Sequence, residues 1–270
     1  DPDKGGSGPK VMVEAKCRAV VHAETAAGAI SDAKTLSALA HEHDCLVIAD
    51  TVTSLAGSPL MVDDWQLDAV YSGTQKCLSC VPGLSPVTFS KRAVEVTTTR
   101  KTRVQSWFMD LNLVLGYWGG GGKRAYHHTA PINTLYALHE ALVILLEEGI
   151  ENSWARHQKN HDALRAGFEA MGLQFVVPEG QRLPQLNAVS VPEGVDEAAV
   201  RSTLLREYNL EIGAGLGAMA GKIWRVGLMG FASNPTNVLF CLGALDAVLS
   251  SMKAPITSGV AVEAARASYR

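Results

Sequence analysis

Short apolar runs and a helical pattern alternate in the first third of the chain. Residues 17–23 form a β-prone run, and an amphipathic helical pattern capped at Ser31 or Asp32 follows it. Residues 45–49 are then continuously apolar up to Asp50. A strand, a helix and a second strand that is apolar throughout predict a parallel sheet buried on both faces, and therefore an α/β fold.

The middle of the chain carries fewer strand signals. Two further strands are expected at residues 67–71 and 84–89. The stretch 91–103 is polar and basic, so we expect it to lie on the surface. Five glycines between residues 116 and 122 predict a flexible loop.

Gly149 separates two long helical patterns. The first pattern covers residues 132–148 and the second covers residues 152–171. We place a domain boundary at this glycine. Residues 17–149 would form a partial, mainly parallel large domain, and residues 150–270 would form a small α+β domain.

The last third mixes both kinds of element. We expect the tail after Ala254 to fray, because its apolar content is low, and residues 1–16 to be a linker-like N-terminus. The expected elements are strands at 173–177, 185–191 and 223–227 and helices at 196–208 and 237–252.

Composition narrows the possible partners. Of the 270 residues 47% are apolar and 19% are charged, so the chain can bury a sizeable core. The net charge is −3 and no basic block stands out, which argues against nucleic acid and anionic membranes as partners. No apolar run approaches the roughly 18 residues of a membrane span, and the start lacks the apolar segment of a signal peptide. Five cysteines, an odd number, favour free thiols in a reducing compartment, so we expect a cytoplasmic protein.

The strand expected at 67–71 ends in the stretch Tyr71-Ser72-Gly73-Thr74-Gln75-Lys76, which delivers a lysine into a loop. A lysine amine can form a Schiff base with an aldehyde cofactor. An apolar surrounding, as Cys77 and Leu78 suggest, would favour that chemistry by removing water from the amine. The alternative is an ordinary solvated lysine.

Asp50 ends an apolar run, where a carboxylate is costly unless it has a donor or a cation as partner. The structural alternative is a bond to the backbone turn of residues 51–54, and the functional one is a pyridinium nitrogen. Arg225 also has apolar neighbours. Its guanidinium can clamp a substrate carboxylate, although a structural ion pair is the default reading.

Three other motifs carry little weight. The glycines of residues 213–218 only partly match a dinucleotide-binding turn, since no acidic residue lies about 20 positions on. The Cys77–Cys80 pair has zinc or redox spacing but no second ligand pair. His157 and His161 are four apart on a helix without the glutamate of a metalloprotease. We therefore predict no metal site.

Several motifs in order resemble the class V (fold type I) pyridoxal-phosphate aminotransferases, in the alanine–glyoxylate / serine–pyruvate branch. The motifs are His22-Ala23-Glu24-Thr25, Ala49 through Gly57, Tyr71 through Lys76, Tyr126-His127-His128-Thr129 and Lys222 through Gly227. The resemblance implies the type I fold, a mainly parallel large domain with a small C-terminal α+β domain. It also implies transfer of an amino group from alanine or serine to glyoxylate or pyruvate, with pyridoxal 5'-phosphate as cofactor.

The same resemblance implies roles for individual residues. Lys76 would form the Schiff base, Asp50 would pair with the pyridine nitrogen and Val52 would pack on the ring. Thr25 would bind the 3-oxygen of the cofactor, and Gln75 would lie at its phosphate.

The remaining roles concern the substrate and a second subunit. Arg225 would bind the substrate carboxylate. Tyr126 and Thr129 would reach the phosphate bound by a partner subunit, so a homodimer is implied. Peroxisomal or mitochondrial location is also known in the family.

One departure leaves alternatives open. The family has a longer N-terminal part of the large domain, of roughly a hundred residues or more, and residues 1–16 do not match it. We therefore expect an incomplete large domain. The alternatives are a non-catalytic remnant that only dimerises or binds a partner, and another class V enzyme such as a cysteine desulfurase.

Overall fold

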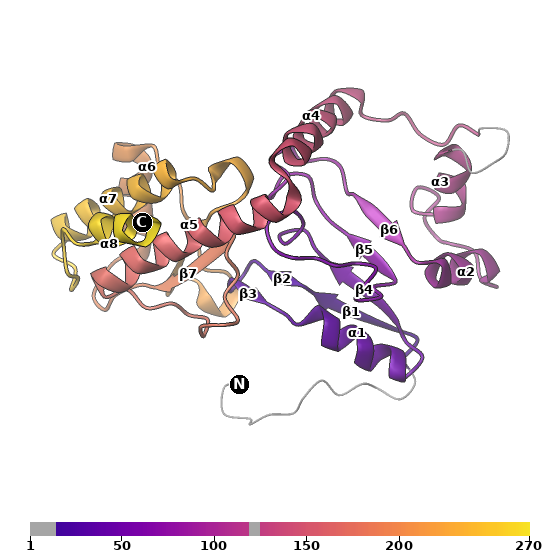
Figure 1. The fold of residues 1–270 in the computed structure, drawn as a ribbon, viewed down its shortest axis with the longest axis horizontal. Coiled ribbons are helices and arrows are strands. Elements are labelled where there is room, and N and C mark those ends of the chain that lie inside the picture. The colour runs from indigo at the N-terminus through magenta and orange to yellow at the C-terminus, as the bar shows by residue number, and fades with distance from the viewer. Residues whose placement is uncertain (1–14, 119–124) are drawn as a thin grey trace.

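The computed structural model describes residues 15–118 and 125–270. Figure 1 shows an α/β part, a C-terminal part and the long helix α5 that runs between them. In the α/β part the elements are β1 (Cys17–Val21), β2 (Ala23–Glu24), β3 (Ala29–Ile30), α1 (Ala33–Glu42), β4 (Leu46–Asp50), β5 (Ala69–Tyr71), β6 (Val87–Phe89), α2 (Lys91–Thr99), α3 (Leu111–Trp118) and α4 (Ile132–Glu148). They are followed by α5 (Ile150–Met171), β7 (Leu186–Ser190), α6 (Glu197–Tyr208), β8 (Gly213–Ala214), η1 (Gly217–Met219), β9 (Ile223–Gly227), η2 (Gly230–Ala232), α7 (Pro235–Ser251) and α8 (Ala261–Tyr269).

The first sheet has the order β1-β4-β5-β6. β1, β4 and β5 are parallel, whereas β6 is antiparallel to β5, so the predicted mainly parallel sheet is confirmed. Val21, Asp50 and Tyr71 are partners in register across the three parallel strands. Since parallel strands end on the same side, their last residues lie together at one edge of the sheet.

Helix α1 packs against β1 and β4. It begins where predicted, because Oδ1 of Asp32 accepts a hydrogen bond from the Thr35 N–H at 3.0 Å and caps the first turn. Beneath the helix, Val47 and Ala49 of β4 are buried with Ala40. Ile48, between them, is 37% exposed on the other side of the strand, so the predicted burial of the sheet on both faces is wrong for this strand.

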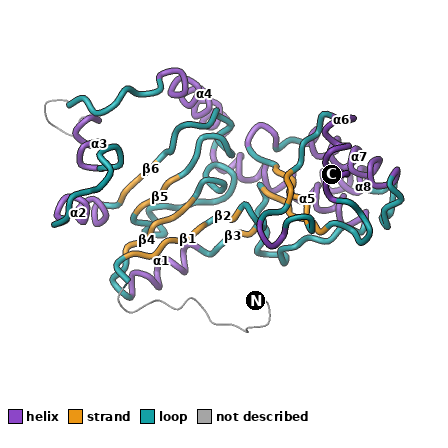
Figure 2. Tube along the Cα trace, turned by 180° about the vertical axis from the view of Figure 1, so that it is seen from behind, coloured by secondary structure: helices purple, strands orange, loops and turns teal. Residues whose placement is uncertain are grey.

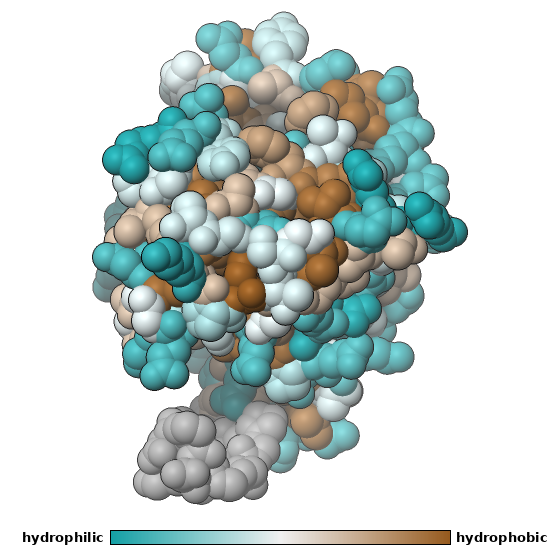
Figure 3. Space-filling model, turned by 90° about the vertical axis from the view of Figure 1, so that its left-hand side faces the viewer, coloured by the Kyte–Doolittle hydropathy of each residue, from teal (hydrophilic) through white to brown (hydrophobic). Residues whose placement is uncertain are grey.

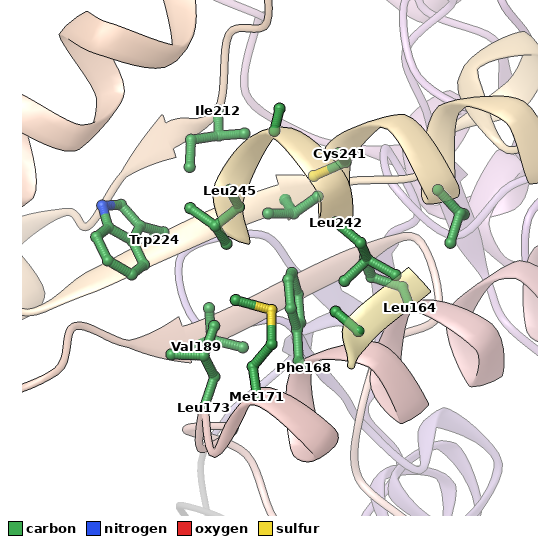
Figure 4. Close-up of a cluster of buried hydrophobic side chains, with 14 of the residues drawn as sticks. Leu164, Phe168, Met171, Leu173, Val189, Ile212, Trp224, Cys241, Leu242 and Leu245 are labelled. Atoms are coloured by element: carbon green, nitrogen blue, oxygen red, sulfur yellow. The ribbon is translucent and has the colours of Figure 1, made fainter. Parts of the chain in front are cut away.

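The C-terminal part has its own core. An antiparallel sheet of order β7-β9-β8 lies with α5, α6, α7 and α8, and their buried side chains meet between them (Figures 2 and 4). Trp224, Phe168 and Leu242 have no exposed surface. Burying each such side chain contributes about 1.5–3 kcal/mol. The core of this part is therefore independent of the first sheet.

Two helices in the middle of the chain were not predicted. Residues expected to be polar surface form α2, because Oγ of Ser90 accepts a hydrogen bond from the Ala93 N–H and caps a helix there. Part of the predicted glycine loop is also wrong, since Gly116 lies inside α3. The other glycines of that loop, residues 119–122, lie outside the described residues.

Two expectations for the C-terminal part are also wrong. The strand expected at 173–177 is reduced to a single bridge from Phe175 to Val189. The tail after Ala254 does not fray, because α8 packs closely on α5 and α7. Its Ala261 and Ala265 are completely buried. Small side chains allow that close approach, which a search for large apolar residues overlooks.

The surface is mixed. On the side of the C-terminal part that Figure 3 shows, hydrophobic side chains lie among hydrophilic ones. The surface of helix α4 is more apolar. None of its residues is buried, and its Tyr136 and Leu146 are 73% and 80% exposed. Among the described residues, no helix has the length and apolarity needed to cross a membrane. The domain boundary at Gly149 stays a prediction.

Candidate active site

Asp50 lies at the carboxyl edge of the first sheet, as the last residue of β4. Its Oδ1 accepts a hydrogen bond from the Val52 N–H at 2.9 Å, which is the backbone partner expected for a half-buried carboxylate. Its Oδ2 accepts a hydrogen bond from the Tyr71 hydroxyl at 2.8 Å. One oxygen is thus held by the backbone, and the other points to the exposed end of the neighbouring strand.

Tyr71 is a site residue to which the sequence analysis gave no role. Its side chain is 40% exposed, and its hydrogen bond to Asp50 raises the pKa of the phenol. The sequence does contain a signal for this contact, because β5 ends in Tyr71 and the neighbouring strand β4 ends in Asp50.

Lys76 lies in the turn that follows β5. Thr74 holds the start of this turn, since its Oγ1 donates a 2.7 Å hydrogen bond to Val81 O. The Lys76 carbonyl accepts a 3.0 Å hydrogen bond from the Ser79 N–H. The Lys76 side chain is half-buried, and its Nζ has no hydrogen bond or ion pair with any other described residue. The amine is therefore available for a reaction partner.

The predicted apolar surrounding of Lys76 exists on one side only. Cys77 and Leu78 are buried, whereas Gln75 is exposed. A Cβ atom on Gly73 would lie 2.7 Å from Oε1 of Gln75 and 3.3 Å from Cγ1 of Val52. The side chains of Gln75 and Val52 thus converge on the space that glycine leaves open at position 73.

Arg225, in β9, is anchored to the first part of the chain. Its Nε donates a 2.7 Å hydrogen bond to Ala214 O, and its Nη1 donates one of 2.9 Å to Thr25 O. It forms no ion pair within the described residues, so the structural ion pair considered for it is wrong there. Backbone carbonyls orient the guanidinium without neutralising it, which suits an anion-binding arginine.

Tyr126 and Thr129 lie together but apart from this edge. The Tyr126 hydroxyl and Oγ1 of Thr129 are 2.6 Å apart, and Tyr126 is 74% exposed. They belong to the connection between α3 and α4, which runs outside the sheet (Figure 1). Within this single chain they are therefore not brought to Asp50 and Lys76.

The remaining motifs have structural roles. His157 and His161 are both buried in α5. His157 is hydrogen-bonded to Ser153 O, and His161 is hydrogen-bonded to Oδ1 of Asn187. Burial raises the pKa of the Cys77 thiol to about 12, so it is not a thiolate at neutral pH. This thiol is unsuited to the nucleophilic role that a cysteine desulfurase requires. The described residues contain no group of three or more His, Cys, Asp or Glu placed to hold a metal ion.

Comparison with known proteins identifies relatives. The sequence model of the family "Aminotransferase class-V" matches residues 10–231. The chain is 37% identical to the (S)-ureidoglycine–glyoxylate transaminase of Bacillus subtilis, with 94% of this chain and 65% of the relative covered. It is 38% identical to the alanine–glyoxylate aminotransferase of Callithrix jacchus, with 85% of this chain and 56% of the relative covered.

Solved structures agree. The ureidoglycine–glyoxylate aminotransferase of Bacillus subtilis superposes with a TM-score of 0.91 at 39% identity and covers 94% of this chain. The alanine–glyoxylate aminotransferase of Nostoc sp. superposes with a TM-score of 0.83 at 49% identity and covers 86%. The chain spans 65% and 61% of these two structures. The fold is that of the type I pyridoxal-phosphate enzymes, as predicted, and the chain belongs to the class V aminotransferases, a pyridoxal-phosphate-dependent family.

Proposed function

We propose that this chain carries the lysine side of a pyridoxal-phosphate aminotransferase site. The reaction would move an amino group from a small amino acid, such as alanine or serine, to a small 2-oxo acid, such as glyoxylate or pyruvate. The observation that carries the proposal is the shared edge of the sheet, where the Asp50 carboxylate ends β4 and the turn after β5 presents a free Lys76 amine. The names of the relatives support both substrate classes.

The residues at this edge fit the cofactor. Gly73 leaves open a space that a Cβ would fill, and Val52 and Gln75 border it. An amine for an aldehyde and a carboxylate for a ring nitrogen are the required donors, and Lys76 and Asp50 provide them. Thr25, Val52 and Gln75 would complete the cofactor contacts of this chain.

When bound, pyridoxal phosphate would supply a protonated aromatic ring that withdraws electrons from the substrate. The Nζ of Lys76 would remove the proton from the substrate α-carbon and return it one position away, as general base and then general acid. The Asp50 carboxylate would keep the proton on the ring nitrogen. Arg225 would hold the substrate carboxylate, so that the α-hydrogen faces Lys76.

The proposal also includes a homodimer and a cytoplasmic location. A homodimer would place Tyr126 and Thr129 of one subunit at the phosphate bound by the other. Their exposure and the uncovered apolar side chains of α4 support such an arrangement. All five cysteines are free thiols, which supports a cytoplasmic location.

The test is a covalent trap. The full chain is mixed with pyridoxal phosphate, reduced with borohydride and digested, and the modified peptide is identified by mass. We expect the label on Lys76 and its loss in Lys76→Ala, whereas Lys159→Ala on the surface of α5 should be labelled like the wild type. A chain that takes up no cofactor would instead be the non-catalytic, dimerising homologue.

A further inference from the structure

The turn that carries Lys76 is tied to a loop much later in the chain. The Ser79 N–H donates a 3.0 Å hydrogen bond to Lys76 O. Oγ of the same serine accepts a 2.7 Å hydrogen bond from the Phe231 N–H, although the two residues are 152 positions apart. Ser79 therefore connects the backbone of Lys76 directly to η2.

The fit between the two loops is unusually close. A Cβ on Gly230 would lie 1.9 Å from Oγ of Ser79 and 2.9 Å from Cys77 O, so only glycine can occupy that position. Gly230 has a φ of 54° and Ser79 has a φ of 57°. A serine in the left-handed region is strained, and such strain persists only where surrounding contacts enforce it. The hydrogen bond from Phe231 is one such contact, beside the backbone hydrogen bonds from the Ser79 N–H to Lys76 O and from the Cys80 N–H to Thr74 O.

Helix α5 supports the other side of this junction. The Gly230 N–H donates a 2.9 Å hydrogen bond to Nε2 of His157, and Nη1 of Arg156 donates one of 2.7 Å to Gly230 O. Arg156 also forms an ion pair with Glu148, in which both carboxylate oxygens of Glu148 accept hydrogen bonds from the guanidinium. His157 accepts at Nε2 and donates from Nδ1 to Ser153 O, so it is neutral, in agreement with a pKa lowered by burial. A rigid helix thus fixes the loop that holds Ser79.

We propose that Ser79 is a positioning residue, which holds the Lys76 turn against η2 and α5 and so sets where the lysine amine lies. The inference rests on the proposed role of Lys76 as the cofactor-binding lysine. Its basis is that the Lys76 side chain has no polar partner of its own among the described residues, so the backbone of the turn determines its place.

Three substitutions separate the hydrogen bond from the strain. Ser79→Ala keeps the strained backbone and loses the acceptor. Ser79→Gly relieves the strain and also loses the acceptor. Ser79→Asn tolerates the left-handed conformation and retains an acceptor oxygen. Ser250→Ala is the control, because among the residues described its hydroxyl bonds only to Asp246, in α7, and to Ser258, in the loop that follows α7.

The first measurement is amide hydrogen exchange of residues 229–233. We expect exchange at Phe231 about fivefold faster in the alanine and glycine variants, since one hydrogen bond is lost. The asparagine variant and the control should match the wild type. Protection of the C-terminal core shows that each variant is folded. Unchanged exchange in the alanine and glycine variants would refute the junction.

The second measurement reports Lys76 itself, with and without cofactor. Acetic anhydride labels Lys76 without cofactor, and borohydride traps it with pyridoxal phosphate. We expect the alanine and glycine variants to change the labelling rate about threefold and to slow trapping about tenfold, with recovery in Ser79→Asn. Faster exchange at Phe231 with unchanged Lys76 labelling would overturn the positioning role. If the wild type traps no cofactor but its Lys76 labelling responds to Ser79, the proposed function fails and the positioning role stands.

Discussion

The hydroxyl of Tyr71 donates a 2.8 Å hydrogen bond to Oδ2 of Asp50, which joins the last side chains of two neighbouring parallel strands. With the Val52 N–H on the other oxygen, the carboxylate is oriented from two sides. We expect Tyr71→Phe to weaken pyridoxal-phosphate binding about fivefold, because one hydrogen bond contributes about 1 kcal/mol. Equilibrium dialysis measures the change. Asp50→Asn should lose far more affinity, and equal losses in the two variants would contradict the orienting role of Tyr71.

Arg225→Lys tests the anchored guanidinium. A lysine cannot bond to Ala214 O and Thr25 O and still present a planar fork to a carboxylate. We expect KM for the amino acid to rise about tenfold or more, with a smaller change in kcat, in steady-state kinetics. Arg206→Lys, on the exposed side of α6, is the control and should leave both constants unchanged. An unaltered KM in Arg225→Lys would show that another group binds the substrate carboxylate.

His22 predicts a loss of stability in acid. The ring is 2% exposed, its Nδ1 has no hydrogen-bond partner in the described part of the chain, and burial lowers its pKa to about 4. In the unfolded chain a histidine has a pKa near 6.5, so below that pH the unfolded state binds more protons. The free energy of unfolding should therefore fall by about 3 kcal/mol from this residue as the pH drops from about 6.5 to 4.

Urea unfolding at a series of pH values checks this. His22→Phe keeps an aromatic ring beside Trp65, which contacts His22 edge-on, and removes the titration. Its stability should depend less steeply on pH than that of the wild type. Some dependence should remain, because burial also lowers the pKa of His157 and His161. Replacing the exposed His43 by glutamine should leave the pH dependence of the free energy of unfolding unchanged. If His22→Phe shows the same pH dependence as the wild type, His22 is not the source of the loss of stability in acid.

Two helical glycines give a matched pair for the packing of α8. A Cβ on Gly167 would lie 2.4 Å from Cδ1 of Leu242 in α7 and 3.0 Å from Ala261 O in α8, so Gly167→Ala must displace the buried Leu242 side chain and crowd α8. We expect a loss of about 1–3 kcal/mol in the free energy of unfolding. On Gly243 the nearest atom to a Cβ is Cγ2 of Val262 at 3.7 Å, an ordinary contact. Gly243→Ala should therefore be neutral or stabilise by up to about 1 kcal/mol, through helix propensity. Equal changes in melting temperature in the two variants would contradict the tight packing around Gly167.

The sheet could be predicted from the sequence because its signals are local. A continuous apolar run ending in Asp50 and a helix capped at Asp32 leave few alternatives, and both elements are confirmed. Helix α8 carries no such signal, because Ala261 and Ala265 are buried where α8 packs on α5 and α7, and Ala261 lies beside Gly167, about a hundred positions away. Contacts of that kind depend on the assembled fold.

The same distinction holds for the candidate site. Asp50 ends one strand and Lys76 lies in the turn after the next, and both were identified from these places in the sequence. The serine that links Lys76 to η2 was not, because Ser79 is an ordinary polar residue until Gly230 lies beside it. Tyr126 and Thr129 remain predictions, since their proposed partner belongs to a second subunit.

The junction between α4 and α5 consists of Gly149 alone, and the ion pair of Glu148 with Arg156 spans it. Arg156 also holds Gly230 and thereby the loop next to Ser79. A change in the angle between the two helices would have to break this ion pair first. A tilt of α4 relative to α5 would consequently disturb Arg156, and with it the Gly230 loop that His157 also holds and that contacts the lysine turn through Ser79.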